Sequence, residues 1–303
     1  MATTLTKTSS YVGEASREYI MKTFSEARSL QGDLLTLKES VSRPWKIRRL
    51  AASGIIADKS CDFTAAGTVT IDERVLTPAD LEVNLELCKD DFKGDWDESR
   101  MGSGATNKSL VPELINPVIE TIKGAIGEDL ERQIYQGDTT GTDQFDGFIK
   151  LATADATVLD VAASTGDFVA GAIAGMKLIK AKAVTAKIAS REDFCYIMSP
   201  TNAEALQNAY RSAGSGQENI SGDVPLSYNG APVYVSYGMP DENIIAARKS
   251  NLYFGTDLSS DWNEVIVKDM SEVDLSDNVR FKLVCTGGVN YGWGSEFVLY
   301  TES

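Results

Sequence analysis

The sequence predicts a mixed α+β fold, and three stretches of patterning support this class. Apolar residues recur every three or four positions from Val111 to Ile134, which is typical of one long helix. Apolar and polar residues alternate strictly from Leu81 to Leu87, as in a strand with a single apolar face. The last third of the chain contains several short apolar runs separated by turn residues, a pattern that favours strands.

The N-terminal segment has few apolar side chains. Between residues 11 and 40 they are too sparse to close a core alone, so this segment is expected to be an extension that packs on another surface. Pro44 and Trp45 interrupt it, and a strand-like texture begins after Gly54. Residues 56–88 are predicted to form a long two-stranded hairpin. Because an isolated hairpin is only marginally stable in water, this hairpin requires a partner surface.

The long helix has clear end signals. A glycine commonly follows the last turn of a helix, and Gly137 takes that place here. Pro112 suits a first helical turn, where its missing N–H is not needed. Pro117 is expected either to kink the helix or to mark its true start.

The rest of the chain alternates two shorter helices with strands. A helix rich in alanine and lysine is predicted over about 167–189. A buried strand at 194–198 runs into Ser199, which caps a helix over 200–211, and a glycine- and serine-rich loop follows at 214–223. Further strands are predicted at Val233–Ser236, Ile244–Ala247, Leu252–Phe254, Val265–Val267, Val279–Cys285 and Phe297–Tyr300.

Composition excludes several classes of protein. The 303 residues include no histidine, which removes Ser-His-Asp triads, Cys-His dyads and imidazole general bases. The sequence has neither a secretory signal nor an apolar run long enough to cross a membrane, so a cytoplasmic protein with no membrane partner is expected. The four cysteines form no CxxC pair, and buried, reduced thiols are expected for Cys61, Cys88, Cys195 and Cys285.

Charge is distributed unevenly along the chain. The formal net charge is −15, and residues 1–50 carry nine basic and five acidic groups, so a basic arm (9 − 5 = +4) precedes an acidic body (−15 − 4 = −19). One interpretation is a solvated helix face of mixed charge; the other is an arm that docks on acidic neighbouring subunits, where opposite charges steer association. An acidic surface of this kind does not favour sequence-specific nucleic-acid recognition.

Two motifs suggest a ligand site without meeting its requirements. Residues 102–109 come within one residue of a phosphate-binding loop, but Asn107 replaces a required glycine and the preceding residues are too charged for a buried strand. Asp138, Asp143 and Asp146 offer carboxylates suited to calcium, but their spacing is not that of an EF-hand loop. We therefore predict a helix-capping loop and an aspartate-rich turn at these places, with no metal and no cofactor.

The order of these elements resembles that of the major capsid proteins of tailed bacteriophages, which share the HK97-like capsid fold. The segments that carry the resemblance lie throughout the chain: VLTPADLEVNLELCKDDF (75–92), EDLERQIYQGD (128–138) with FDGF (145–148), YIMSPTNAEALQNAY (196–210) and YNGAPVYVSYGMPDENIIAARKSNLYFGTDL (228–258).

The resemblance implies a division of the chain into four parts. These are an N-terminal arm (1–54), an extended loop or E-loop (55–95), a peripheral domain (96–149 and 249–303) with a spine helix at about 110–136, and an axial domain (150–248).

It also implies a function: self-assembly into hexamers and pentamers that form the icosahedral head of a tailed phage around double-stranded DNA. The implied location is the virion capsid, assembled in the host cytoplasm, and the implied partners are portal, scaffolding and decoration proteins. Because the sequence has no long N-terminal scaffolding domain, a separate scaffolding protein is expected. Contacts with the packaged DNA, or between subunits, are expected at four basic residues: Arg43, Lys46, Arg48 and Arg49.

Two alternatives remain open from the sequence. An encapsulin-like bacterial compartment shares the fold but encloses cargo enzymes. An acidic enzyme that uses paired carboxylates is the alternative from another class, although no particular pair of acids is distinguished in the sequence. The predicted role is structural, not enzymatic.

Overall fold

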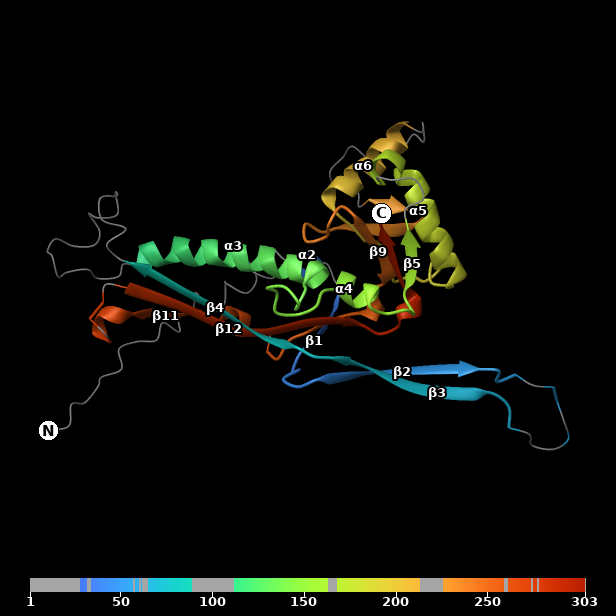
Figure 1. Cartoon of the computed structure of the whole chain (residues 1–303), viewed down its shortest axis with the longest axis horizontal. Coiled ribbons are helices and arrows are strands. Elements are labelled where there is room, and N and C mark those ends of the chain that lie inside the picture. Colours follow the sequence, from blue (N-terminus) through green and yellow to red (C-terminus); the bar gives the residue numbers. More distant parts are fainter. Residues whose placement is uncertain are drawn as a thin grey trace.

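The computed structural model describes residues 28–31, 34–56, 58–59, 61, 65–88, 112–162, 168–212, 226–258, 261–273, 275–276 and 278–302. Two β-sheets with their helices form an elongated body, and a two-stranded hairpin projects from it (Figure 1). The mixed α+β class is confirmed. In the described part of the chain, no helix is both long and apolar enough to span a membrane.

The first sheet is built around one long strand, β12 (Asn278–Tyr291). Its neighbours are β4 (Ala79–Cys88), β10 (Leu252–Gly255) and β11 (Ile266–Asp269), all antiparallel to it, and β1 (Thr36–Lys38) pairs with the far edge of β10. Helix α3 (Pro112–Gln136) lies along this sheet (Figure 1), where Ile119 packs against Val279 and Phe281. This helix and sheet bury one core between them.

The second sheet contains six strands in the order β5-β13-β9-β6-β8-β7. The strands are β5 (Leu159–Ala162), β6 (Phe194–Met198), β7 (Ser227–Tyr228), β8 (Ala231–Val235), β9 (Asn243–Arg248) and β13 (Phe297–Thr301). Helices α5 (Phe168–Thr185) and α6 (Pro200–Ser212) pack together beside this sheet, which stands at one end of α3 (Figure 1).

The strand pairing corrects the predicted hairpin. The hairpin is not formed within residues 56–88: β3 (Thr68–Leu76) pairs with β2 (Trp45–Ser53), whereas β4 runs back into the first sheet. The last strand, β13, lies between β5 and β9 in the second sheet, apart from β10, β11 and β12 of the first. The partners of β4 and β13 are distant in sequence, and local patterning does not specify them, whereas β2 and β3 are consecutive strands of one hairpin.

The ends of the long helix agree with the sequence signals. Helix α3 begins at Pro112 and continues through Pro117, so Pro117 does not mark its start. The helix ends before Gly137, and only a glycine fits there because a Cβ would lie 2.3 Å from the Phe145 carbonyl oxygen. Ser199 caps α6 by accepting a hydrogen bond from the Asn202 backbone N–H, as predicted.

The described part of the N-terminal segment packs on its own chain, which corrects the expectation that it lacks an intramolecular partner. Leu34 and Leu35 are buried in the main core, and β1 extends the first sheet. The short helix α2 (Arg28–Gln31) places Ser29 against α3. Residues 1–27 lie outside the described part of the chain, as do the phosphate-loop-like segment at 102–109 and the loop at 214–223.

A buried carboxylate joins three elements at this point. Glu131 of α3 accepts hydrogen bonds from the hydroxyl groups of Ser29 (2.6 Å) and Ser236 (2.5 Å), and all three side chains are buried. The Tyr135 hydroxyl lies 2.6 Å from Ser29 Oγ and extends the network. Glu131, on α3, thereby connects this helix with α2 and with the turn that follows β8 in the second sheet.

Candidate functional site

The β2–β3 hairpin presents an apolar surface to solvent. In the antiparallel register Leu50 lies opposite Ile71, so both side chains project from the same face. That face carries four exposed apolar residues, which we call the apolar stripe: Leu50, Val69, Ile71 and Val75, with exposed fractions of 67%, 61%, 75% and 42%. Neighbouring apolar residues this exposed on a projecting element are typical of a protein-binding surface.

The opposite face anchors the base of the hairpin to the body. Leu76 is fully buried and Ile47 nearly so, and together with Val41 they form a small separate core. Leu76 Cδ2 would lie 2.5 Å from a Cβ at position 255, so Gly255 leaves room for this side chain. The Trp45 ring meets Tyr253 edge to face at a centroid distance of 5.8 Å. The base is therefore fixed, while the outer half of the hairpin projects without such contacts.

The four basic residues predicted as contact sites lie at this hairpin but do not share one environment. Lys46 forms an ion pair with Glu73 on the same face as the apolar stripe. Arg49 lies on the opposite face, where it pairs with Asp72 and donates to the Gly292 carbonyl oxygen at 3.0 Å. Arg43 and Arg48 are exposed. The structure thus brings Lys46 and Arg48 together beside the stripe and directs Arg49 into the body.

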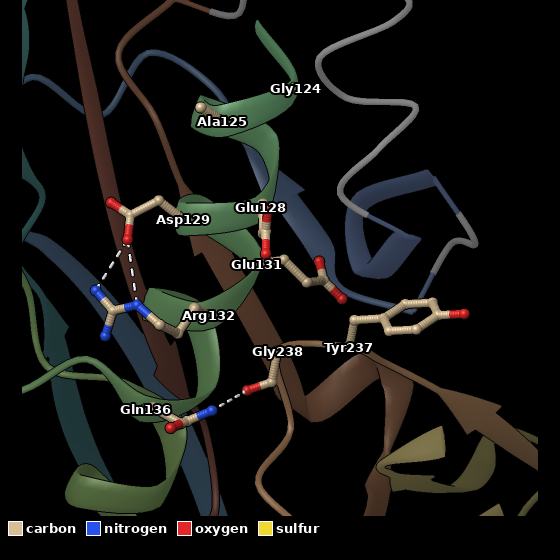
Figure 2. Close-up of a pocket in the computed structure, with 9 residues that line it drawn as sticks. All are labelled: Gly124, Ala125, Glu128, Asp129, Glu131, Arg132, Gln136, Tyr237 and Gly238. Atoms are coloured by element: carbon tan, nitrogen blue, oxygen red, sulfur yellow. Dashed lines mark hydrogen bonds and ion pairs between the residues drawn. The ribbon is translucent and has the colours of Figure 1, made fainter. Parts of the chain in front are cut away.

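A groove of about 800 Å³ runs between the second half of α3 and the turn between β8 and β9 (Figure 2). Its acids are largely engaged: Asp129 accepts from Arg132, and Glu131 belongs to the buried network. Glu128 is exposed, and the Gln136 amide donates to the Gly238 carbonyl oxygen at 2.7 Å. The groove therefore offers no pair of free carboxylates placed for acid–base chemistry.

The three aspartates after α3 form a closed polar turn. Lys150 donates to Asp138 (2.6 Å) and Asp146 (2.7 Å), and Arg132 donates to Asp143 (2.6 Å). The hydrogen bond from Lys150 is the main reason that the pKa of Asp138 lies well below its usual value, and the Arg132 guanidinium likewise lowers the pKa of Asp143. Within the described residues no cluster of acids or cysteines is arranged to hold a metal ion.

We expect calcium to leave the stability of the protein unchanged, because cationic side chains already occupy the positions that the ion would take between these carboxylates. Thermal unfolding with millimolar calcium and with EDTA should give the same Tm. A site filled at a hundred times its Kd would add about 2.7 kcal/mol and raise Tm by roughly 5 °C, and a rise of that size would contradict this interpretation of the turn.

The cysteines separate into two groups, which corrects the expectation that all four are buried. Cys195 and Cys285 are buried, and burial raises the pKa of each thiol to about 12. Cys88 is half-buried, and Cys61, near the end of the hairpin, is exposed. None of the four is in a disulfide.

One family model matches the chain, and several solved structures share its fold. Residues 113–286 match the model of the phage capsid family. The fold is similar to the capsid of a native GTA particle (TM-score 0.61, 14% identity, covering 100% of this chain and 95% of that one). It is also similar to the structure from Gordonia phage Cozz (TM-score 0.59, 14% identity, 91% and 86% covered). No curated protein sequence matches the chain.

A further similar structure is a virus-like particle from Pyrococcus furiosus (TM-score 0.53, 11% identity, 95% of this chain and 98% of that one covered). These likenesses establish the HK97-like capsid fold predicted from the order of elements. The family model covers more than half of the 303 residues. The chain therefore belongs to the phage capsid family.

Proposed function

We propose that this major capsid protein self-assembles into hexamers and pentamers, which close into the icosahedral head of a tailed phage around double-stranded DNA. The observation that carries the proposal is the projecting β2–β3 hairpin, which exposes the apolar stripe on one face and is anchored on the other. An exposed apolar surface of this kind is typical of a contact with another chain. A second copy that does so supplies the repeated contact from which a shell is built.

In the proposed contact, the apolar stripe of one copy meets a different surface of the next copy, which makes the contact heterologous. Heterologous contacts form rings when the rotation between copies closes, and five-fold and six-fold rings are the units of an icosahedral shell. The hairpin also supports a revised boundary for the extended loop, which we place at residues 45–76 instead of 55–95.

The remaining parts take their proposed roles from the two sheets. The first sheet with α3 serves as the peripheral domain, with α3 as its spine. The second sheet with α5 and α6 serves as the axial domain around the symmetry axes, and it includes β13 as well as residues 150–248. Within the predicted arm (1–54), the described residues contribute α2, β1 and β2 to these units, and residues 1–27 lie outside the described part of the chain.

Contact with packaged DNA is proposed to be non-specific and secondary. Arg43 and Arg48 are exposed and can approach phosphates, whereas Arg49 is directed into the body. Portal, scaffolding and decoration proteins are the further proposed partners. A shell with Arg43, Lys46 and Arg48 neutralised that packages an unchanged length of DNA would count against the DNA contact.

An encapsulin-like compartment is the second candidate function. The similarity of the fold to the Pyrococcus furiosus virus-like particle supports this candidate. Purified particles separate the two functions through their contents. A phage head expressed with its packaging partners encloses nuclease-protected double-stranded DNA, whereas a compartment encloses a protein cargo that mass spectrometry identifies. Absence of any large particle by light scattering, alone or with phage lysate, would reject both.

A further inference from the structure

The base of the hairpin contains an arginine that is held on two sides by the body. The guanidinium of Arg74, on β3, lies over the Tyr291 ring, 3.9 Å from its centroid, and donates to Asp155 Oδ2 at 2.7 Å. Tyr291 is the last residue of β12, and Asp155 lies in the turn between helix α4 (Phe148–Thr153) and β5. One side chain of the hairpin therefore contacts both the first sheet and the turn that leads into β5 of the second sheet.

The acceptor carboxylate is itself fixed in place. Asp155 Oδ1 accepts from the Thr157 backbone N–H (2.9 Å) and hydroxyl (2.7 Å), and Oδ2 accepts from the Tyr291 hydroxyl (3.0 Å). Burial alone would raise the pKa of Asp155, but these hydrogen bonds and the one from Arg74 outweigh burial and hold the pKa well below its usual range. A Cβ at Gly294 would lie 2.1 Å from Thr157 Oγ1, so the β12–β13 connection closes tightly over this turn.

A second arginine acts on the neighbouring strand. Arg49 of β2 donates to the Gly292 carbonyl oxygen and lies over the Trp293 ring at 5.1 Å. The Trp293 backbone is held in turn by the buried Asn251 side chain, which accepts from the Trp293 N–H (2.7 Å) and donates to its carbonyl oxygen (2.9 Å). Both strands of the hairpin thus dock on the same segment that leaves β12.

We propose that Arg74 and Arg49 form a clamp that sets the angle at which the hairpin leaves the body, and that they are positioning residues for shell assembly. This inference rests on the proposed function. The described residues of the outer half of the hairpin, 50–56 and 65–73, are all exposed, so the contacts at the base set the direction of the apolar stripe. Nine residues of strand extend about 30 Å, so a turn of about 10° at the base moves the far end by about 5 Å.

Arginine suits this place better than lysine. A planar guanidinium stacks on a ring while donating in its own plane to a carboxylate, whereas an ammonium group makes only a point contact. The clamp residues also share no surface with the stripe, because they lie on the opposite face of the hairpin. A substitution at the clamp therefore changes the direction of the stripe without changing its chemistry.

The test measures the direction of the hairpin in the unassembled full-length subunit. Spin labels at Thr70→Cys on β3 and Glu204→Cys on α6, with Cys61 and Cys88 replaced by serine, report the distance between the hairpin and the second sheet. We expect one narrow distance distribution for the parent, at least a two-fold broader one for Arg74→Ala, and an intermediate width for Arg74→Lys. Lys46→Ala, which removes an exposed ion pair on the other face, is the matched control and should stay narrow.

Assembly is then measured on the same variants without labels. Arg74→Ala should assemble at least ten-fold more slowly, while far-UV circular dichroism confirms that the subunit remains folded. A distance distribution for Arg74→Ala as narrow as that of the parent would overturn the clamp, and a broadened distribution with an unchanged assembly rate would overturn its positioning role. Failure of the parent itself to assemble would instead reject the proposed function, since the distance measurement does not depend on a shell.

Discussion

Ile71→Asp should abolish shell assembly while leaving the subunit folded. Ile71 is 75% exposed in the isolated chain, so its replacement should change the free energy of unfolding by no more than about 0.5 kcal/mol. In the proposed contact the same side chain is covered by a neighbouring copy. The change then removes roughly 1.5–3 kcal/mol of apolar burial per subunit and places an unpaired carboxylate in an apolar interface. Sedimentation velocity should show subunits or small oligomers and no shells.

Thr70→Asp is the matched control for this experiment. It introduces the same charge on the adjacent residue of the same strand, but Thr70 faces away from the apolar stripe. Shells should form with Thr70→Asp. Normal shells from Ile71→Asp would show that the stripe is not the interface, and loss of shells from both variants would show that the added charge, not the face, is responsible.

The second large effect is expected inside the subunit, at Glu131. Glu131→Ala removes the acceptor shared by Ser29 and Ser236 and leaves both buried hydroxyl groups without it. A buried donor left unsatisfied costs about 1–3 kcal/mol, so we expect a loss of roughly 2–5 kcal/mol in the free energy of unfolding by urea. Because Ser29 lies on α2, proteolysis near residues 28–31 should also become faster.

Glu128→Ala controls for the change in the helix itself, since this exposed glutamate lies one turn before Glu131 on α3. Its effect should stay within about 0.5 kcal/mol. Glu131→Gln keeps one acceptor oxygen, so its free energy of unfolding should lie between those of Glu131→Ala and Glu128→Ala. Equal stabilities of Glu128→Ala and Glu131→Ala would show that the network does not connect the three elements as described.

Local structure followed from the sequence wherever one element's own pattern decides it. The strand Phe194–Met198 is observed with its predicted bounds, and α6 begins where Ser199 and Pro200 indicated. The long helix ends at the expected glycine. In these segments side-chain periodicity and capping depend on neighbours only a few residues away.

Pairing over long distances could not be predicted in the same way. Trp45 and Ile47 alternate with Lys46 and Arg48, which is a strand signal, but the clustered positive charge also fits a basic arm. The sequence alone therefore does not identify β2, and it pairs β3 with the wrong strand. The place of β13 between β5 and β9 depends on strands at least about fifty residues away. No local pattern specifies such a partner.

The candidate site was predicted only in part. The sequence predicted Arg43, Lys46, Arg48 and Arg49 as contact residues of an N-terminal arm, and their contacts with DNA or with other subunits stay a prediction. It could not show that Arg49 turns toward Gly292 while Arg48 stays exposed. Arg74 and Glu131 were not predicted at all, because each looks like an ordinary charged surface residue until its partners, Asp155 and Ser236, are brought near by the fold. Only the three-dimensional arrangement reveals these contacts.

Electron cryomicroscopy of the assembled protein would resolve the contact between subunits itself. We expect closed shells of hexamers and pentamers in which the β2–β3 hairpin of each subunit lies on its neighbour with Leu50 and Ile71 covered. A subunit that remains a compact monomer under all assembly conditions, alone and with phage lysate, would contradict this expectation. Shells in which the apolar stripe faces solvent would contradict it as well.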